Sequence, residues 1–300
     1  MNLKGEPARV GRHCGANRYC VTPEVVAFYA DALDDPCELY RKVAPPLLYH
    51  SECYRFVLEW YLKNLFGNLH ARQDWECFAP IEIGSAVRTR STIVERYHKR
   101  GRDYIVNETD VLAEADGRLL VRGRTHQSFL PPRDKESGDF VVDAGTAARK
   151  GEREPFPTAT GRELAATTKT VDARRCWMFS GPGKNYHTDR DAARQLGFPN
   201  IVVQGMMTTC FVAQVMQDEF GMGWIEGGRM SVKLVNVLWV DERVTARARV
   251  REATPEGDRV RVGCDVWVDK DDGTRVLAGT ASALTVPQPS ESPVPVPREI

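Results

Sequence analysis

Two related segments settle the architecture of this chain: Pro80-Ile-Glu-Ile-Gly-Ser-Ala-Val-Arg-Thr-Arg-Ser-Thr-Ile-Val94 and Val237-Leu-Trp-Val-Asp-Glu-Arg-Val-Thr-Ala-Arg-Ala-Arg-Val250. Both alternate apolar and polar residues, which is the period of a half-buried antiparallel strand. A second alternating segment follows each of them, over residues 101–111 and 257–267. The offset between the two halves stays near about 156 residues. The chain therefore repeats one β-rich unit.

Turn signals divide each unit into strands. Asp116-Gly117 and Asp272-Gly273 are hairpin turns, because glycine adopts a positive φ at little cost. Apolar strand-like residues follow each pair, at 119–123 and 276–279. Each half is therefore expected to end in a meander of at least three long strands.

One strong helix precedes each meander, over roughly residues 51–64 and 206–220. The second helix is apolar nearly all round, so it is expected to be buried. A buried helix wrapped by an antiparallel sheet is the hot-dog architecture, an α+β fold. The repeat predicts two hot-dog units in tandem.

The domain boundaries follow from composition. We expect an N-terminal hot-dog domain over 1–132 and a C-terminal hot-dog domain over 169–286. Between them, 133–168 is rich in charge and glycine with little periodicity, which is typical of a linker. The proline-rich residues 287–300 are expected to form an extended tail.

Composition limits the classes of partner. Lys plus Arg total 41 and Asp plus Glu total 41, so nothing favours a nucleic-acid partner. No apolar run approaches the roughly 20 residues of a membrane span, and the N-terminus lacks a signal-peptide pattern. The eight cysteines are scattered without a C-x-x-C pair, which indicates reduced thiols in a cytoplasmic protein and no metal site.

The chemistry is concentrated in Asn185-Tyr-His-Thr-Asp189 and the nearby Val203-Gln-Gly205. Thr188 is predicted to cap a short helix that Gly197 and Pro199 end, which leaves Asn185 and His187 in the preceding loop. Gly205 begins the long buried helix, whose first N–H groups are free.

These residue types suit water addition to an enoyl thioester. A neutral histidine can remove a proton from water, and Asn185 can hold that water. The N–H at Gly205, with the positive end of the helix dipole behind it, can stabilise the carbonyl oxygen as it gains charge. Each residue also has a plainer role: His187 as a loop residue, Asn185 as a turn former, and Gly205 as a close-packing residue.

The Asn-x-His-Thr-Asp run, Gly197-Phe198 and Val203-Gln-Gly205 resemble the MaoC-like dehydratase or (R)-specific enoyl-CoA hydratase family. Asn68-Leu-His-Ala-Arg-Gln-Asp-Trp75 and Pro80-Ile-Glu-Ile-Gly84 are similar to the N-terminal domain of its double hot-dog members. The resemblance covers about residues 20–130 and 170–286.

The resemblance implies a hydro-lyase with His187 as catalytic base and the N–H of Gly205 as oxyanion donor. The implied substrate is an enoyl or 3-hydroxyacyl thioester of coenzyme A or a carrier protein, from fatty acid or polyketide metabolism. The first half would shape the acyl pocket. No metal or redox cofactor is implied.

The sequence departs from the family motif Asp-x-Asn-Pro-x-His. Pro182 stands five residues before His187, where the motif has aspartate, and Asn185 is two residues before the histidine instead of three. Either Asn185 and His187 suffice, or another acid enters from elsewhere, or the hydratase activity is altered or lost.

Five further residues are candidates for substrate binding because they flank the motif or the helix starts: Asp189, Gln204, Met206, Met207 and His50. Asp189 is alternatively a helix-start charge, and the two methionines are alternatively core residues. His50 aligns with the start of the second helix, where a capping or buried role competes with ligand contact.

His70 and Asp74 could form a pair in the first half, but a spacing of four residues in a loop or strand does not decide it. Two other functions stay open beside the hydro-lyase: a thioesterase-type hydrolase, and a hot-dog protein with diverged or lost hydratase activity in a biosynthetic pathway. Pairing of two chains into a homodimer also stays open.

Overall fold

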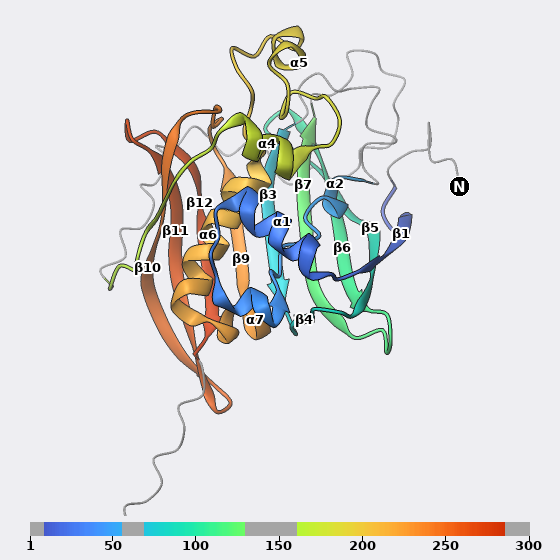
Figure 1. The fold of residues 1–300 in the computed structure, drawn as a ribbon, viewed down its shortest axis with the longest axis vertical. Helices are drawn as coiled ribbons and strands as arrows, with labels where there is room; N and C mark the ends of the chain where they lie inside the picture. The colour runs from blue at the N-terminus through green and yellow to red at the C-terminus, as the bar shows by residue number, and fades with distance from the viewer. Residues whose placement is uncertain (1–8, 56–68, 130–160, 286–300) are drawn as a thin grey trace, which may run out of the picture.

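The computed structural model describes residues 9–55, 69–129 and 161–285. Ten of the strands in these ranges form one sheet (Figure 1). In sheet order, the first half supplies β1 (His13–Cys20), β5 (Ala86–Lys99), β6 (Arg102–Ala113), β7 (Leu119–Phe129) and β3 (Leu69–Cys77). The second half continues with β9 (Arg229–Leu234), β12 (Arg275–Leu284), β11 (Arg259–Lys270), β10 (Arg243–Glu256) and β8 (Thr167–Thr170).

The sheet order is the same in both halves when it is counted from the centre outward. Strands β3 and β9 pair antiparallel at the centre, with Trp75 opposite Met230. Strands β5, β6 and β7 correspond to β10, β11 and β12, which begin 157, 157 and 156 residues later. The internal repeat read from the sequence is therefore confirmed strand by strand.

Helices cover one side of this sheet (Figure 1). They are α1 (Pro23–Leu33), α2 (Glu52–Arg55), α4 (Ala173–Ser180), α5 (Arg190–Gln195), α6 (Gly205–Phe220) and α7 (Met222–Gly227). A 3-10 helix η1 (Glu38–Arg41) and a small sheet of β2 (Val43–Ala44) and β4 (Ile81–Glu82) complete the first half. Helices α1 and α4 are equivalents: each begins at a polar N-cap, Thr22 or Asp172, whose side chain accepts a backbone N–H.

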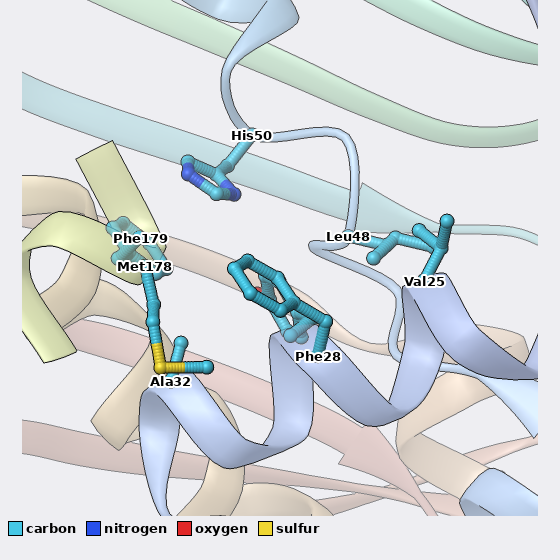
Figure 2. A pocket seen from close by; sticks show the side chains of 8 residues that line it. Val25, Phe28, Ala32, Leu48, His50, Met178 and Phe179 are labelled. Carbon is cyan, nitrogen blue, oxygen red and sulfur yellow. The ribbon is translucent and has the colours of Figure 1, made fainter. Parts of the chain in front are cut away.

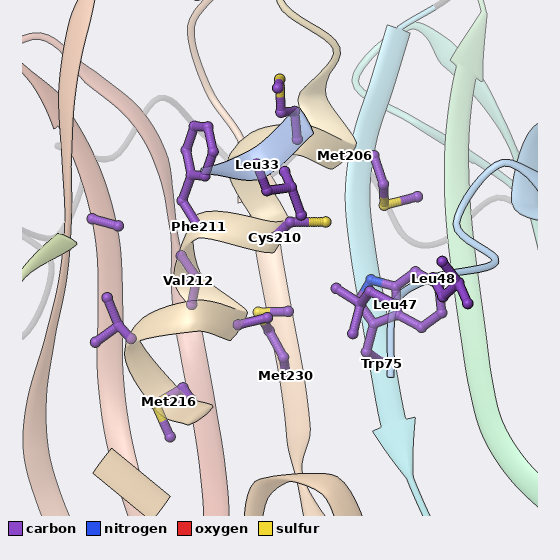
Figure 3. Close-up of a cluster of buried hydrophobic side chains, with 14 of the residues drawn as sticks. Leu33, Leu47, Leu48, Trp75, Met206, Cys210, Phe211, Val212, Met216 and Met230 are labelled. Carbon is purple, nitrogen blue, oxygen red and sulfur yellow. The ribbon is translucent and has the colours of Figure 1, made fainter. Parts of the chain in front are cut away.

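Helix α6 is the centre of the second half. Only Gly205, Asp218 and Glu219 of its 16 residues escape burial, as its apolar surface predicts. Phe211 and Met216 are among the buried side chains shown with Met230 of β9 in Figure 3. The helix start at Gly205 is thus fixed by packing along the whole length of the helix.

The inner face of the first half differs from that of the second. Where β10 and β11 carry apolar side chains, the corresponding positions of β5 and β6 carry polar ones that are almost fully buried: Thr89, Ser91, Asn107 and Thr109. Asn107 joins them, because its amide donates to the carbonyl of Cys53 and to Thr109 Oγ1, and its Oδ1 accepts from Ser91 Oγ at 2.5 Å. A hydrogen-bonded polar layer therefore replaces part of the apolar core in this half.

The first-half helix expected over 51–64 is described only at its start, as α2, and the remainder of that prediction lies outside the described residues. The expected domain boundaries remain predictions. The tandem hot-dog architecture itself is confirmed by two five-strand units arranged about one β3–β9 junction.

Candidate functional site

The loop between α4 and α5 carries the central candidates. Asp189 is the N-cap of α5, where its carboxylate accepts the N–H groups of Asp191 and Ala192. The prediction that Thr188 caps this helix is therefore wrong. The Thr188 hydroxyl donates instead to Gly183 O at 2.8 Å and accepts the N–H of Asn185.

Asn185 holds this loop in shape. Its Oδ1 accepts the backbone N–H of His187 at 2.8 Å, and its Nδ2 donates to the carbonyls of Ser180 and Gly183 at 3.2 and 3.4 Å. These bonds use both ends of the side-chain amide within the loop. This geometry provides the turn-forming role of Asn185, and its proposed contact with the reacting water remains a prediction.

The His187 ring is fixed by one short hydrogen bond. Its Nδ1 lies 2.7 Å from the carbonyl oxygen of Val202, an acceptor, so Nδ1 carries the proton and Nε2 presents its lone pair. The ring also packs against Tyr186, with centroids 4.0 Å apart. Burial lowers the pKa of His187 from 6.5 to about 4, and the bond to Val202 opposes this only in part. The imidazole is therefore neutral at physiological pH.

The anchor of His187 lies directly before helix α6. Val202 also donates its own N–H to Tyr186 O, and it pairs with Trp239 in an isolated bridge. Val202 and Gly205 are three positions apart in the sequence, so their Cα atoms are at most about 11 Å apart. The loop, the anchor and the helix start therefore form one connected unit.

Several polar side chains lie at the first turn of α6. The N-cap residue Gln204 makes no side-chain cap, and its buried Oε1 has no hydrogen-bond partner within residues 9–55, 69–129 and 161–285. The hydroxyls of Thr208 and Thr209 both donate to the carbonyl of Gly205. A Cβ at Gly205 would lie 2.4 Å from Leu234 Cδ1, so glycine lets β9 approach the helix start closely.

The other predicted binding residues separate into two groups. Met206 and Met207 are 0% and 1% exposed and belong to the hydrophobic core. Asp189 is occupied as a helix cap, and its Oδ2 also lies 3.4 Å from Lys184 Nζ. Their proposed contacts with substrate therefore remain predictions, with packing and capping as the roles that the geometry provides.

His50 lies in a turn before α2 and is 5% exposed. Its ring stacks on Phe179 of α4 with centroids 3.9 Å apart and an interplanar angle of 11°. Neither ring nitrogen has a hydrogen-bond partner among the residues that the structure describes. Burial lowers its pKa to about 4, although nearby backbone at Phe179, Leu47 and Leu48 opposes the shift. His50 lines a small cavity, which is discussed below.

His70 and Asp74 do not contact each other. His70 bonds the Tyr54 hydroxyl at 2.7 Å and Gln73 Oε1 at 3.1 Å, whereas Asp74 Oδ2 lies 3.1 Å from Nε2 of His126. Both residues are on β3, where they belong to separate hydrogen-bond groups. The possible His70–Asp74 pair is therefore not formed.

Sequence reasoning missed one participant, Val202. It acts through its backbone carbonyl, which accepts the hydrogen bond of His187 Nδ1. No side-chain pattern in the sequence reveals such a role.

All eight cysteines are free thiols. Among residues 9–55, 69–129 and 161–285, no three His, Cys, Asp or Glu side chains converge as metal ligands would. The helices in these same ranges are all too short or too polar to cross a bilayer.

Comparison with known protein families finds a match in the second half of the chain. Residues 155–266 match the MaoC-like domain. Curated proteins gave no match. The family resemblance predicted from the Asn-x-His-Thr-Asp run is thus confirmed for this part of the chain.

Solved structures match nearly the whole chain. A MaoC-like dehydratase is 17% identical, with a TM-score of 0.70 over 93% of this chain and 98% of that one. A MaoC-like dehydratase from Phytophthora capsici is 12% identical, with a TM-score of 0.67 over 93% and 97%. A Mycobacterium tuberculosis protein described as having a double hot-dog fold is 14% identical, with a TM-score of 0.63 over 92% and 96%. The chain is a double hot-dog protein, and its residues 155–266 are similar to the MaoC-like domain.

Proposed function

We propose that this protein is a hydro-lyase that adds water to an enoyl thioester, or removes it from a 3-hydroxyacyl thioester, of coenzyme A or a carrier protein. The observation that carries the proposal is the hydrogen bond between His187 Nδ1 and the carbonyl of Val202. It leaves Nε2 as a lone-pair acceptor on a neutral ring. It also ties that ring to the segment that opens helix α6.

In the proposed reaction, His187 Nε2 takes a proton from water while the water oxygen attacks the β-carbon. The electron pair of the double bond moves toward the thioester, whose oxygen becomes an enolate. The N–H of Gly205 donates to that oxygen, supported by the α6 dipole. The protonated imidazole then returns its proton to the α-carbon, so the net change is addition of one water.

This sequence of steps needs only one titratable residue, which suits a loop that lacks the upstream aspartate of the family motif. Asp189 does not substitute for it, because its carboxylate caps α5. The depressed pKa of His187 makes the protonated imidazole a strong acid, which favours rapid return of the proton to carbon. Asn185 contributes by fixing the backbone N–H of His187.

The MaoC-like domain match over residues 155–266 supports this reaction class over thioester hydrolysis. The neutral residues around Gln204 support it as well, since no carboxylate from 201–208 is available as a hydrolytic base.

A panel of enoyl-CoA thioesters tests the proposal directly. The native protein is mixed with crotonyl-CoA, longer enoyl-CoAs and aromatic enoyl-CoAs, and two signals are followed: absorbance of the conjugated double bond and release of free thiol. We expect loss of absorbance without thiol release for at least one member. Thiol release with the double bond intact would identify a thioesterase, and an unchanged panel would contradict both activities.

A further inference from the structure

A small cavity lies between the two halves, separate from the His187–Val202 anchor. Its volume is about 140 Å³. Helix α1 lines it with Phe28 and Ala32, helix α4 lines it with Met178 and Phe179, and His50 closes one side (Figure 2). A cavity of roughly 150 Å³ lined by apolar side chains holds benzene, so this one accepts a ring or a short chain of similar size.

The His50 ring is built into this cavity wall. It stacks on Phe179 and lies 5.7 Å from the ring of Tyr29, so its plane is fixed by aromatic neighbours. Tyr29 already bonds Cys210 through its hydroxyl. Among the side-chain polar atoms of the lining, the two nitrogens of His50 are those that lack a hydrogen-bond partner in the described part of the chain. A buried polar group without a partner is costly, which makes this imidazole a receptor for one polar atom.

The chemistry of the ring selects the kind of polar atom. A neutral imidazole has one N–H donor and one lone-pair acceptor, and either can face the cavity depending on the tautomer. A hydroxyl both donates and accepts, so it can pair with either nitrogen. A charged group does not fit, because the cavity lining contains no ionised side chain to compensate it.

We propose that this cavity is a binding site for a small apolar group of about six carbons that bears one hydroxyl, with His50 as the hydrogen-bonding residue. Phenol and cyclohexanol are representatives of this chemical class. The same chemistry is found in a free small molecule and in the hydroxylated far end of an acyl chain, and the test below separates these two sources. The proposal does not depend on hydratase activity.

The test titrates methyl-labelled methionine in the full-length protein with phenol and, separately, with benzene. Met178 lines the cavity, whereas Met206 and Met207 are core residues that do not, so they are internal references. We expect phenol to shift the Met178 methyl and the His50 ring resonances, with a dissociation constant roughly fivefold or more below that of benzene, as one added hydrogen bond provides.

His50→Leu is the matched variant, because leucine keeps the cavity apolar and removes the hydrogen bond. In this variant the affinities for phenol and benzene should converge. Phenol binding that leaves Met178 unshifted, or an advantage over benzene that survives in His50→Leu, would overturn the proposal. If His50→Leu fails to fold, the native comparison decides alone: equal affinities, or shifts confined to the reference methionines, would also overturn it.

Competition separates the sources. Phenol that inhibits turnover of an enoyl thioester in native protein, but not in His50→Leu, identifies the cavity as the place of the acyl end. Phenol binding that leaves turnover unchanged identifies a site for a free small molecule. Both results require the Met178 shift, so the binding proposal is decided even when no enoyl thioester is turned over.

Discussion

Replacing Asn185 distinguishes a positioning residue from one that holds the reacting water. Asn185→Ala removes the acceptor of the His187 N–H at 2.8 Å and the donor to two carbonyls at 3.2 and 3.4 Å. Each such bond contributes about 1 kcal/mol net to the free energy of unfolding. Because the residue is half-buried and one of its three bonds is long, we expect Asn185→Ala to destabilise the loop by about 1–2 kcal/mol. A displacement of the catalytic ring by about 1 Å costs on the order of a hundredfold in rate.

Two assays are read together for this variant: kcat for the best enoyl thioester, and the ring resonances of His187. We expect kcat to fall tenfold to a hundredfold with KM little changed, and the His187 resonances to move. Asn185→Asp keeps the acceptor for the His187 N–H but not the donor, so it should recover part of the rate. Asp116→Ala, which removes the acceptor of the Arg118 N–H in the exposed turn between β6 and β7, is the control and should leave both readouts unchanged.

Asn185 is not a positioning residue if Asn185→Ala lowers kcat while the His187 resonances stay in place. That pattern would mean that Asn185 contacts water or substrate directly. Full activity in the variant would remove Asn185 from the mechanism altogether.

Three further predictions follow from single features. Burial lowers the pKa values of His50, His70 and His187 from 6.5 to about 4 in the folded protein. As the pH falls, the unfolded chain therefore protonates these three imidazoles near pH 6.5, whereas the folded chain protonates them only near pH 4. The free energy of unfolding should therefore rise from pH 4 to pH 6.5. The acid limb of kcat/KM should lie near pH 4, because His187 must be neutral to act as the base. An acid limb near pH 6.5 would contradict a buried neutral base. Asn107→Ala should destabilise the first half by about 3 kcal/mol or more in urea unfolding, because it strands the Ser91, Thr109 and Cys53 groups that it bonds. The triple variant Ser91→Ala, Asn107→Cys, Thr109→Val copies the apolar residues of the second half and should cost less than that single change; a larger loss in the triple variant would refute the argument. Gly205→Ala should lower both kcat and the free energy of unfolding, because the added Cβ would lie 2.4 Å from Leu234 Cδ1. Adding Leu234→Val to this variant should recover part of both quantities. No recovery would show that the glycine is needed for another reason.

The fold could be predicted from the sequence because the duplication exposes each strand twice. The alternation in β5 recurs in β10, and the Asp-Gly turns fix where the next strand begins. The buried helix α6 was equally readable, since its surface is apolar on every side. The polar inner face of the first half was not expected, because Thr89, Ser91, Asn107 and Thr109 still alternate with the other face and the period is unchanged.

The site was predictable in its residue types but not in its hydrogen bonds. The motif indicates a histidine before a short helix and a glycine at the start of a long one. It does not reveal that the side chain of Asn185 makes hydrogen bonds within the loop. It also does not reveal that Asp189, and not Thr188, caps the helix, because either of these adjacent residues can act as an N-cap. His50 could be aligned with the helix start of the other half, but its stacking on Phe179 joins residues 129 positions apart and needs the folded chain.

The central claim is that the imidazole of His187 is the base of a hydration reaction. The most direct measurement is the initial rate of enoyl thioester hydration by native protein and by His187→Gln, with circular dichroism to show that both are folded. Glutamine can still donate a hydrogen bond to the Val202 carbonyl but cannot take a proton from water, so the rate should fall by about two to four orders of magnitude. A folded His187→Gln variant that hydrates the thioester at the native rate would contradict the account.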